Sequence, residues 1–152
     1  MGCLKKILMG VGALVVLAVI GAVVASRGAS TNQLAAVNVP ISDINFTELD
    51  EVYQVGSKYT DIQKEETWKK YDGKKVKWTG AISDISETLG TLQLQVKMKE
   101  DTFTSDLLIR LKDDQKEKAL KLNVGDSVTF TGILDEWGTL MPITLSAGEI
   151  TQ

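Results

Sequence analysis

The sequence contains no histidine and a single cysteine, Cys3. These two shortages exclude nucleophilic sites of the Ser-His-Asp and Cys-His kinds, and also zinc sites built from histidine and cysteine. One cysteine cannot form an intramolecular disulfide, so the fold depends on packing alone. The remaining route to hydrolysis would use two carboxylates, for which the chain has no motif. We therefore expect a protein that is not an enzyme and that uses no cofactor and no metal.

Basic residues are also few once the N-terminal segment is set aside. The chain of 152 residues has 17 basic and 20 acidic residues and a net charge of −3. Lys5, Lys6 and Arg27 precede residue 28 without any acidic residue, so the remainder holds 14 basic and 20 acidic residues, a net charge of −6. Neutralisation of phosphates by basic residues supplies most of the affinity for nucleic acid. An acidic domain makes nucleic acid an unfavoured partner.

The chain begins with a long apolar run. The nineteen uncharged residues Ile7–Ala25 are just enough to cross a bilayer. The alternative is a signal peptide that is cleaved before Ser26, since Val23 and Ala25 are small residues at a suitable spacing. Signal peptides usually have shorter apolar cores, which favours a retained anchor. We assign residues 1–27 as an N-terminal membrane anchor or signal peptide.

The charges beside this run predict its orientation. Two lysines precede it and one arginine follows it, so the positive-inside rule keeps the N-terminus in the cytoplasm. Residues 28–45 are mostly small and polar, which is typical of a linker, and residues 46–152 are expected to form the folded domain. We expect a single-pass protein of the cytoplasmic membrane whose C-terminal domain lies outside, in the periplasm or the extracellular space.

Helical patterns come before any strand pattern in this domain. Apolar residues at helical spacing predict a short helix over about 47–56, with Thr47 placed to cap it. A second short helix, capped by Thr60 or Asp61, is expected to run toward Lys70. The domain thus begins with two short helices.

Alternation of apolar and polar residues then predicts five short strands. The second is the clearest, because Leu92, Leu94, Val96 and Met98 alternate with glutamine and lysine. A short helix that starts at Asp114 separates the third strand from the fourth. The strands are expected at residues 74–85, 91–99, 106–111, 127–137 and 140–150.

This order of elements predicts a fold. The strands are too short and too regularly spaced for an α/β sheet, and five strands with a helix between the third and fourth match the oligonucleotide/oligosaccharide-binding (OB) barrel. The predicted fold class is all-β: a five-stranded, OB-fold-like Greek-key barrel, preceded by short helices and one N-terminal transmembrane segment. An open α+β sheet is the alternative.

Two sequence motifs also resemble a known family. Over about residues 60–150 the chain resembles bacterial envelope proteins with a tRNA-anticodon-like OB-fold domain. The resemblance implies an OB barrel behind an N-terminal export or anchor segment, and it brings no catalytic motif. The most specific stretches are Gly73-Lys74-x-Val76-x-Trp78-Thr79-Gly80 and Gly125-Asp126-x-Val128-x-Phe130-x-Gly132.

The outer face of the second and third strands is the expected binding surface, because OB barrels usually bind there and in the adjoining loops. This surface has two cations and no aromatic ring on the strands, so it suits a protein or a glycan of the envelope at least as well as a nucleic acid. A tryptophan in the last loop could join it, or could close the end of the barrel. The candidate ligand-binding residues are Gln93, Gln95, Lys97, Arg110 and Trp137.

A run of lysines offers an alternative function. Cations interleaved with Trp68, Tyr71 and Trp78 would suit single-stranded nucleic acid, which stacks its bases on aromatic rings. The inward parity of Trp78 on its strand favours a structural role instead. Our main hypothesis is an outward-facing, non-enzymatic binding module, with nucleic-acid binding as the alternative. The residues of that alternative are Lys69, Lys70, Lys74, Lys75 and Lys77.

Overall fold

A computed structural model describes residues 39–100, 102–138 and 142–151 of the chain. The predicted membrane anchor and most of the predicted linker lie outside these residues. Within these ranges, no helix is long and apolar enough to cross a membrane.

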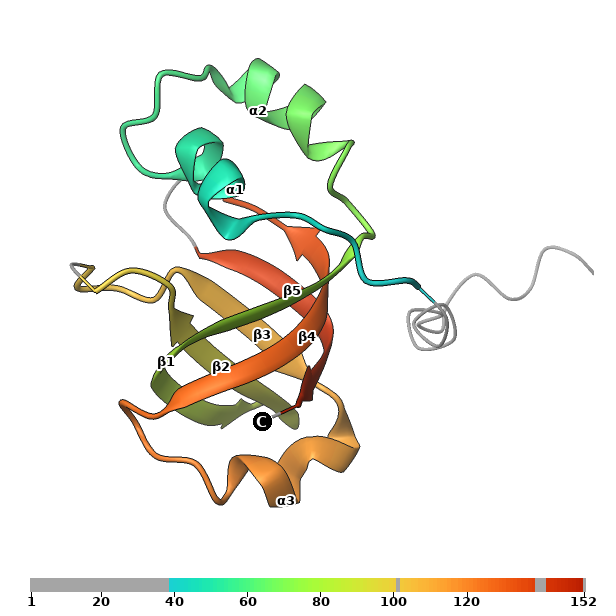
Figure 1. Ribbon diagram of the computed structural model, residues 1–152, viewed down its shortest axis with the longest axis vertical. Coiled ribbons are helices and arrows are strands. Elements are labelled where there is room, and N and C mark those ends of the chain that lie inside the picture. The colour runs from blue at the N-terminus through green and yellow to red at the C-terminus, as the bar shows by residue number, and fades with distance from the viewer. Residues whose placement is uncertain (1–38, 101, 139–141, 152) are drawn as a thin grey trace, which may run out of the picture. The chain divides into compact units, whose positions relative to one another are not determined.

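The five strands close into a barrel (Figure 1). Around the barrel the order is β1-β2-β3-β5-β4, and every neighbouring pair is antiparallel except β3 and β5. This is an OB-fold-like Greek-key barrel, so the predicted barrel is confirmed and the open α+β sheet is excluded. The strands are β1 (Lys75–Thr88), β2 (Thr91–Lys97), β3 (Leu107–Leu111), β4 (Ser127–Glu136) and β5 (Ile143–Ile150).

Strand β1 is long enough to serve two neighbours. Its first half, Lys75–Ala81, pairs with β4, and its second half, Ala81–Thr88, pairs with β2. The change of partner coincides with a register shift between Ile82 and Asp84, which is a bulge of the kind that bends strands. Gly80 precedes it, and a Cβ there would lie 2.5 Å from the Val96 side chain and 2.7 Å from the Lys97 carbonyl oxygen. The barrel closes because β1 bends here.

The barrel interior is apolar, as the alternation predicts. Val76, Trp78 and Ile82 of β1 are buried, and so are the inward residues of the other strands. The interior positions that are fully buried with large side chains include Leu94, Val96, Leu107, Ile109, Val128, Phe130, Leu134 and Leu145.

Helices lie at the two ends of the barrel. In Figure 1, α1 (Phe46–Tyr53) and α2 (Asp61–Trp68) lie above it, and η2 (Asp113–Gln115) with α3 (Lys116–Ala119) lies below. The buried Gln115 side chain accepts a hydrogen bond from the Ile150 backbone N–H, which fixes the lower helices to β5.

The predicted caps are partly correct. Thr60 caps α2 in a reciprocal capping box with Gln63, as one of the two alternatives predicted. The prediction that Thr47 caps α1 is wrong, because Asn45 accepts the hydrogen bond from the Thr47 N–H. The helical segment predicted to start at Asp114 begins one residue earlier, at Asp113 of η2, and the Asp114 side chain accepts a hydrogen bond from Gln115.

A tight turn joins β1 and β2. Its two residues, Leu89 and Gly90, have φ angles of 51° and 77°. Two consecutive positive φ angles fit a two-residue type I′ hairpin turn, which prefers asparagine or glycine at its first position. A leucine there carries a steric cost, and its side chain is fully exposed.

We expect Gly80→Ala to lower the free energy of unfolding by about 3 kcal/mol, because the added methyl meets a backbone oxygen that cannot move freely. Gly73→Ala is the matched control: Gly73 has a positive φ but open space around it, so about 1 kcal/mol is expected. Urea unfolding of the full chain in detergent micelles, followed by tryptophan fluorescence, measures both. An equal loss of unfolding free energy in the two variants would show that β1 is not tightly packed at Gly80.

We expect Leu89→Asn to raise the free energy of unfolding by about 0.5 kcal/mol, because asparagine tolerates the left-handed conformation better than leucine. Leu89→Ser removes the same exposed side chain without that backbone preference, and it should leave stability nearly unchanged. The same urea titration distinguishes them. A stabilisation by serine as large as that by asparagine would mean that the leucine side chain, rather than its backbone, carries the cost.

Candidate functional site

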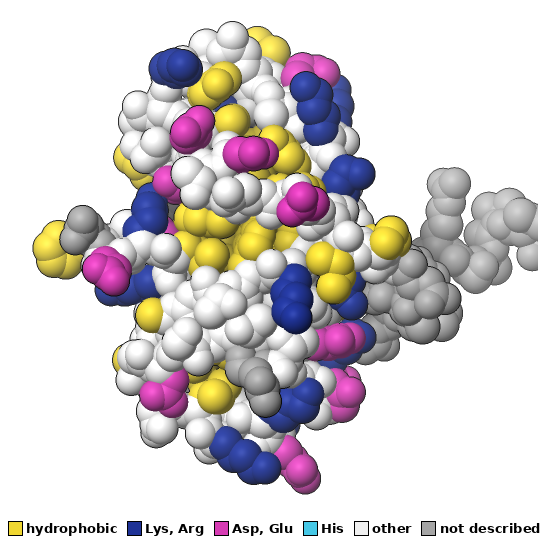
Figure 2. All heavy atoms as spheres, in the orientation of Figure 1, with side chains coloured by type: hydrophobic (Ala, Val, Ile, Leu, Met, Phe, Trp, Pro, Cys, Tyr) yellow, Lys and Arg dark blue, Asp and Glu magenta, His cyan; other side chains and the backbone are white. Residues whose placement is uncertain are grey.

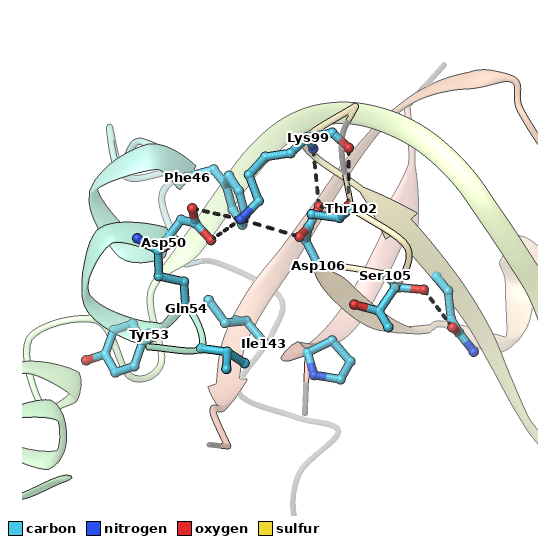
Figure 3. A pocket seen from close by; sticks show the side chains of 13 residues that line it. Phe46, Asp50, Tyr53, Gln54, Lys99, Thr102, Ser105, Asp106 and Ile143 are labelled. Carbon is cyan, nitrogen blue, oxygen red and sulfur yellow. Dashed lines mark hydrogen bonds and ion pairs between the residues drawn. The ribbon is translucent and has the colours of Figure 1, made fainter. Parts of the chain in front are cut away.

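A cavity of about 430 Å³ lies beside the upper end of the barrel (Figure 3). Its walls come from α1, from the loop between β2 and β3, and from the start of β5. A volume of this size is in the range of small-ligand sites. The lining residues are Phe46, Asp50, Tyr53, Gln54, Val55, Gln95, Lys99, Thr102, Thr104, Ser105, Asp106, Pro142 and Ile143.

The α1 wall follows from helical spacing. Phe46, Asp50 and Tyr53 are four and three residues apart, so they share one face of the helix. Phe46 also packs edge-on against Trp78 of the barrel, with ring centroids 5.7 Å apart. This contact fixes the helix face on which the cavity is built.

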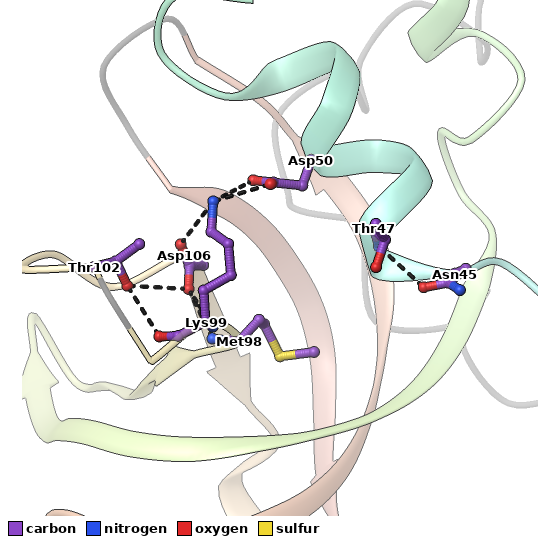
Figure 4. Close-up of polar contacts among 7 residues, drawn as sticks. All are labelled: Asn45, Thr47, Asp50, Met98, Lys99, Thr102 and Asp106. Carbon is purple, nitrogen blue, oxygen red and sulfur yellow. Dashed lines mark hydrogen bonds and ion pairs between the residues drawn. The ribbon is translucent and has the colours of Figure 1, made fainter.

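One carboxylate organises the opposite wall. Asp106 accepts hydrogen bonds from the backbone N–H groups of Met98 (2.7 Å) and Lys99 (3.2 Å) (Figure 4). The Thr102 hydroxyl lies 3.5 Å from the same carboxylate oxygen. Asp106 therefore holds the β2–β3 loop in its folded shape, and the loop presents its hydroxyl side chains to the cavity.

Lys99 joins the two walls. Its Nζ lies 2.8 and 2.9 Å from the two carboxylate oxygens of Asp50 and 3.8 Å from Asp106 (Figures 3 and 4). The three charged groups give the cavity a net charge of −1. Lys99 is already engaged by the two carboxylates, so the cavity has little capacity left for an anionic ligand.

A chain of hydroxyl and amide groups connects the cavity to the predicted binding surface. The Ser105 hydroxyl donates to the Gln95 side-chain oxygen at 2.8 Å, and it lies 2.9 Å from the Ser83 hydroxyl. Gln95 is therefore both a predicted surface residue and a cavity residue. Neutral hydrogen-bonding groups dominate this side of the site.

The structure brings four of the five predicted ligand-binding residues onto neighbouring strands. Gln93 lies opposite Arg110 in the pairing of β2 with β3, and Gln95 lies opposite Leu108. Lys97 lies at the end of β2 opposite Ala81 of β1. The predicted face exists as a contiguous surface on β2 and β3.

The cation at the centre of that face is not free. Arg110 forms ion pairs with Asp135 at 3.0 Å and with Glu136 at 3.4 Å. The pKa of the Asp135 carboxyl is raised, because burial and the neighbouring carboxylates of Glu136 and Asp72 together outweigh the lowering effect of Arg110. The charge of Arg110 is thus more than balanced by two neighbouring carboxylates.

Trp137 has a different environment. Its half-buried ring lies 5.1 Å from the Tyr53 ring, and the Lys64 ammonium lies 5.9 Å above it. Tyr53 also packs edge-on against Trp68 and donates a hydrogen bond to the Lys64 carbonyl oxygen. Burial raises the pKa of the Tyr53 hydroxyl, so it remains a donor. Trp137 belongs to an aromatic cluster that joins the upper helices to the barrel.

The lysines of the alternative site are spread over exposed and half-buried positions. Lys70, Lys74 and Lys77 are exposed, Lys75 is half-buried, and Lys69 is exposed and pairs with Glu66 at 2.5 Å.

The tryptophan rings between these lysines are buried. Trp68 and Trp78 expose only 9% and 8% of their surface. Trp78 points inward, as its parity predicts, and its Nε1 donates to the Ile44 carbonyl oxygen at 2.8 Å. Neither tryptophan can offer a free face for base stacking.

Sequence reasoning missed the charged triad of Asp50, Lys99 and Asp106. Lys99 and Asp50 are 49 residues apart, and no short-range pattern links them. An aspartate just before a strand is an ordinary turn residue by sequence. In the part of the chain that the structure describes, no three His, Cys, Asp or Glu side chains cluster closely enough to hold a metal ion.

The family model described as tRNA_anti-like matches residues 1–144 of the chain. The chain belongs to the tRNA_anti-like family. The resemblance inferred from the two motifs is therefore confirmed, and the match extends to the N-terminal segment as well. No curated protein matches the chain.

Several solved structures are similar to the tRNA_anti-like chain. A candidate nucleic acid-binding lipoprotein from Klebsiella pneumoniae subsp. pneumoniae MGH 78578 has 22% identity over 57% of this chain and 77% of its own, with a TM-score of 0.45. An OBody bound to hen egg-white lysozyme has 14% identity over 55% and 80%, with a TM-score of 0.43. The asparaginyl-tRNA synthetase of Pyrococcus horikoshii has 21% identity over 55% and 21%, with a TM-score of 0.39.

We expect Asp106→Ala to cost about 2 kcal/mol of unfolding free energy, because two backbone N–H groups lose their acceptor. Asp50→Ala removes a partly exposed ion pair and should cost less than about 1 kcal/mol. Urea unfolding of the full chain compares the two. If Asp50→Ala were the more damaging change, the ion pair with Lys99, rather than the loop, would dominate the stability of the cavity.

Proposed function

We propose that this protein is a non-enzymatic binding module, held at the outer face of the cytoplasmic membrane, which engages a protein or glycan of the envelope through the cavity and the adjoining face of β2 and β3. The observation that carries the proposal is the cavity itself, because its polar wall continues through Gln95 onto that face. Concave sites with an apolar floor and a few placed polar groups are the usual form of ligand sites.

The chemistry of the cavity favours a ligand without phosphate groups. Its charged triad has a net charge of −1, and its remaining polar groups are neutral hydroxyls and amides. Phe46 and Ile143 supply apolar area beside them. Hydroxyls and amides hydrogen-bond well to peptide groups and to sugar hydroxyls. A peptide or a glycan satisfies such a site better than a polyanion does.

The arrangement of the carboxylates supports a role without catalysis. Asp106 is occupied by backbone N–H groups, and Asp50 is occupied by Lys99. A general acid or base needs a carboxylate that can exchange its proton with a substrate. Both cavity carboxylates instead act as fixed acceptors that hold the walls.

The proposed location rests on the N-terminal sequence. An apolar run of nineteen residues behind two lysines is suited to insertion with the N-terminus in the cytoplasm. The folded domain follows this run, so it would face outward. Outside the cytoplasm an acidic domain would meet proteins and glycans far more often than nucleic acid.

Nucleic-acid binding remains the alternative proposal, and it has less support. Single strands bind to rings that offer a free face beside cations. The tryptophans beside the lysine run are buried, and Arg110 on the strand face is paired with two acidic residues. The lysine run therefore has no free tryptophan face beside it.

We expect a photoreactive residue at the Thr104 position to cross-link to an envelope component in spheroplasts that carry the full chain. Val55→Trp should reduce the cross-linked product at least about tenfold, because the indole fills the cavity that the ligand needs. The control is Ile62→Trp: Ile62 is exposed to 74%, against 76% for Val55, but it does not line the cavity. External protease should remove the product from intact spheroplasts.

Three results would contradict the proposal. Equal cross-linking in the Val55→Trp and Ile62→Trp variants would mean that the cavity is not the site. A product protected from external protease, beside an exported control that is digested, would place the domain inside. A cross-link to nucleic acid would support the alternative function.

A further inference from the structure

The second half of β1 has a free edge. Residues 84–88 pair with β2 on one side, and on the other side they have no main-chain partner among the residues that the structure describes. The pairing with β4 ends at Ala81, and Ile82 bonds to Gly125 and Asp126 just beyond it. From there to the turn, the strand is an open sheet edge.

The turn determines which groups face outward. The residues that flank a two-residue hairpin turn exchange two main-chain hydrogen bonds, and here they are Thr88 and Thr91. Along an antiparallel ladder, hydrogen-bonded pairs alternate with pairs that are not hydrogen-bonded to each other. Ser86 therefore also bonds to β2, while Ile85 and Glu87 direct their N–H and C=O groups to the free edge. Four main-chain groups are thus available to a further strand.

Exposed apolar side chains surround this edge. Leu89 is fully exposed at the turn, and Leu120 and Val124 expose 77% and 70% of their surface. Val124 precedes Gly125, whose N–H bonds to Ile82, so it lies beside the start of the edge. Leu120 follows Lys116 by one helical turn, and Lys116 pairs with Glu87 at 2.8 Å.

We propose that this edge is a docking site for an extended segment of another protein, which adds as a strand beside β1. An exposed edge with unpaired N–H and C=O groups is a template for strand addition. The site lies at the same end of the barrel as α3, whereas the cavity lies at the end with α1 (Figure 1). It is therefore a second site, independent of the cavity.

The surroundings specify the chemistry of the segment. Asp84 and Asp126 have no ion-pair partner in the described ranges. Glu87 is a third acidic group, and it pairs with Lys116, so the three acidic groups together exceed the one lysine in charge. A segment with alternating apolar residues and at least one lysine or arginine would complement both the leucines and the acidic groups. A second copy of this chain would bring the same acidic edge against itself, so repulsion disfavours self-pairing.

The space-filling view shows both hydrophobic and charged side chains on the surface of the protein (Figure 2). In Figure 2, hydrophobic side chains gather in the upper half of the face shown, whereas in the lower half they are scattered between charged ones. Main-chain hydrogen bonds would therefore supply much of the affinity, with the apolar side chains providing selectivity.

A selection of random linear peptides against the full chain in detergent micelles tests the proposal. We expect enrichment of peptides in which apolar residues alternate and at least one residue is basic. Fluorescence anisotropy with an enriched peptide should show binding about tenfold weaker or worse for Glu87→Pro, because proline removes an outward N–H that an edge strand does not otherwise use. Glu87→Gln keeps that N–H and should weaken binding less than about threefold.

Two further variants separate docking from folding and from the cavity. Leu89→Asn should still weaken peptide binding several-fold. Because this variant stabilises the turn, the weaker binding cannot be attributed to unfolding. Val55→Trp should leave peptide binding unchanged, since Val55 lines the cavity at the other end. Failure of peptide binding would leave the Thr104 cross-link unaffected, so the two proposals fail separately.

Several outcomes would overturn the inference. Equal binding by Glu87→Pro and Glu87→Gln would mean that the edge is not used, and so would a selection that enriches no alternating peptide. A dimer in analytical ultracentrifugation that Glu87→Pro dissociates would identify a second copy, rather than a partner protein, as the occupant.

Discussion

The bend in β1 is the constraint on which the rest of the structure depends. One strand of fourteen residues pairs with β4 along its first half and with β2 along its second, so it closes the barrel on both sides. This exchange of partners requires a sharp change of direction, which a bulge after Ile82 and the absence of a side chain at Gly80 allow. The same exchange leaves the far half of β1 with an unpaired edge. Closure of the barrel and the free edge therefore have one physical cause.

The two ends of the barrel differ because different segments close them. At one end, α1 and α2 pack through the cluster of Tyr53, Trp68 and Trp137, and a cavity remains between α1 and the β2–β3 loop. At the other end, α3 is short and is fixed by the buried Gln115. Leu120 and Val124 remain exposed there, since four residues of helix cannot cover them. The end with the helical pair can hold a ligand in a cavity, and the end with α3 offers an edge and scattered apolar side chains.

Charge is arranged to hold loops rather than to form a cationic surface. Asp106 and Lys99 fold the β2–β3 loop and connect it to α1, and Arg110 is paired with two acidic residues of β4. These pairings use the cations that an OB barrel would otherwise offer to phosphates. The acidic character seen in the sequence thus persists at the level of individual sites.

The sequence by itself determined the barrel, because alternation of apolar and polar residues fixes which face of each strand is buried. The inward positions of Val76, Trp78, Leu94, Val96, Phe130 and Leu134 follow from that period of two. Tertiary structure alone decided the cavity, since Asp50 and Lys99 meet only when α1 folds over a loop 49 residues away. It also decided that the Trp137 ring packs against Tyr53, because an aromatic residue after a strand has no sequence signal for its packing partner. Short-range periodicity reports burial within one element, whereas contacts between elements depend on how the barrel closes and which loops it brings together.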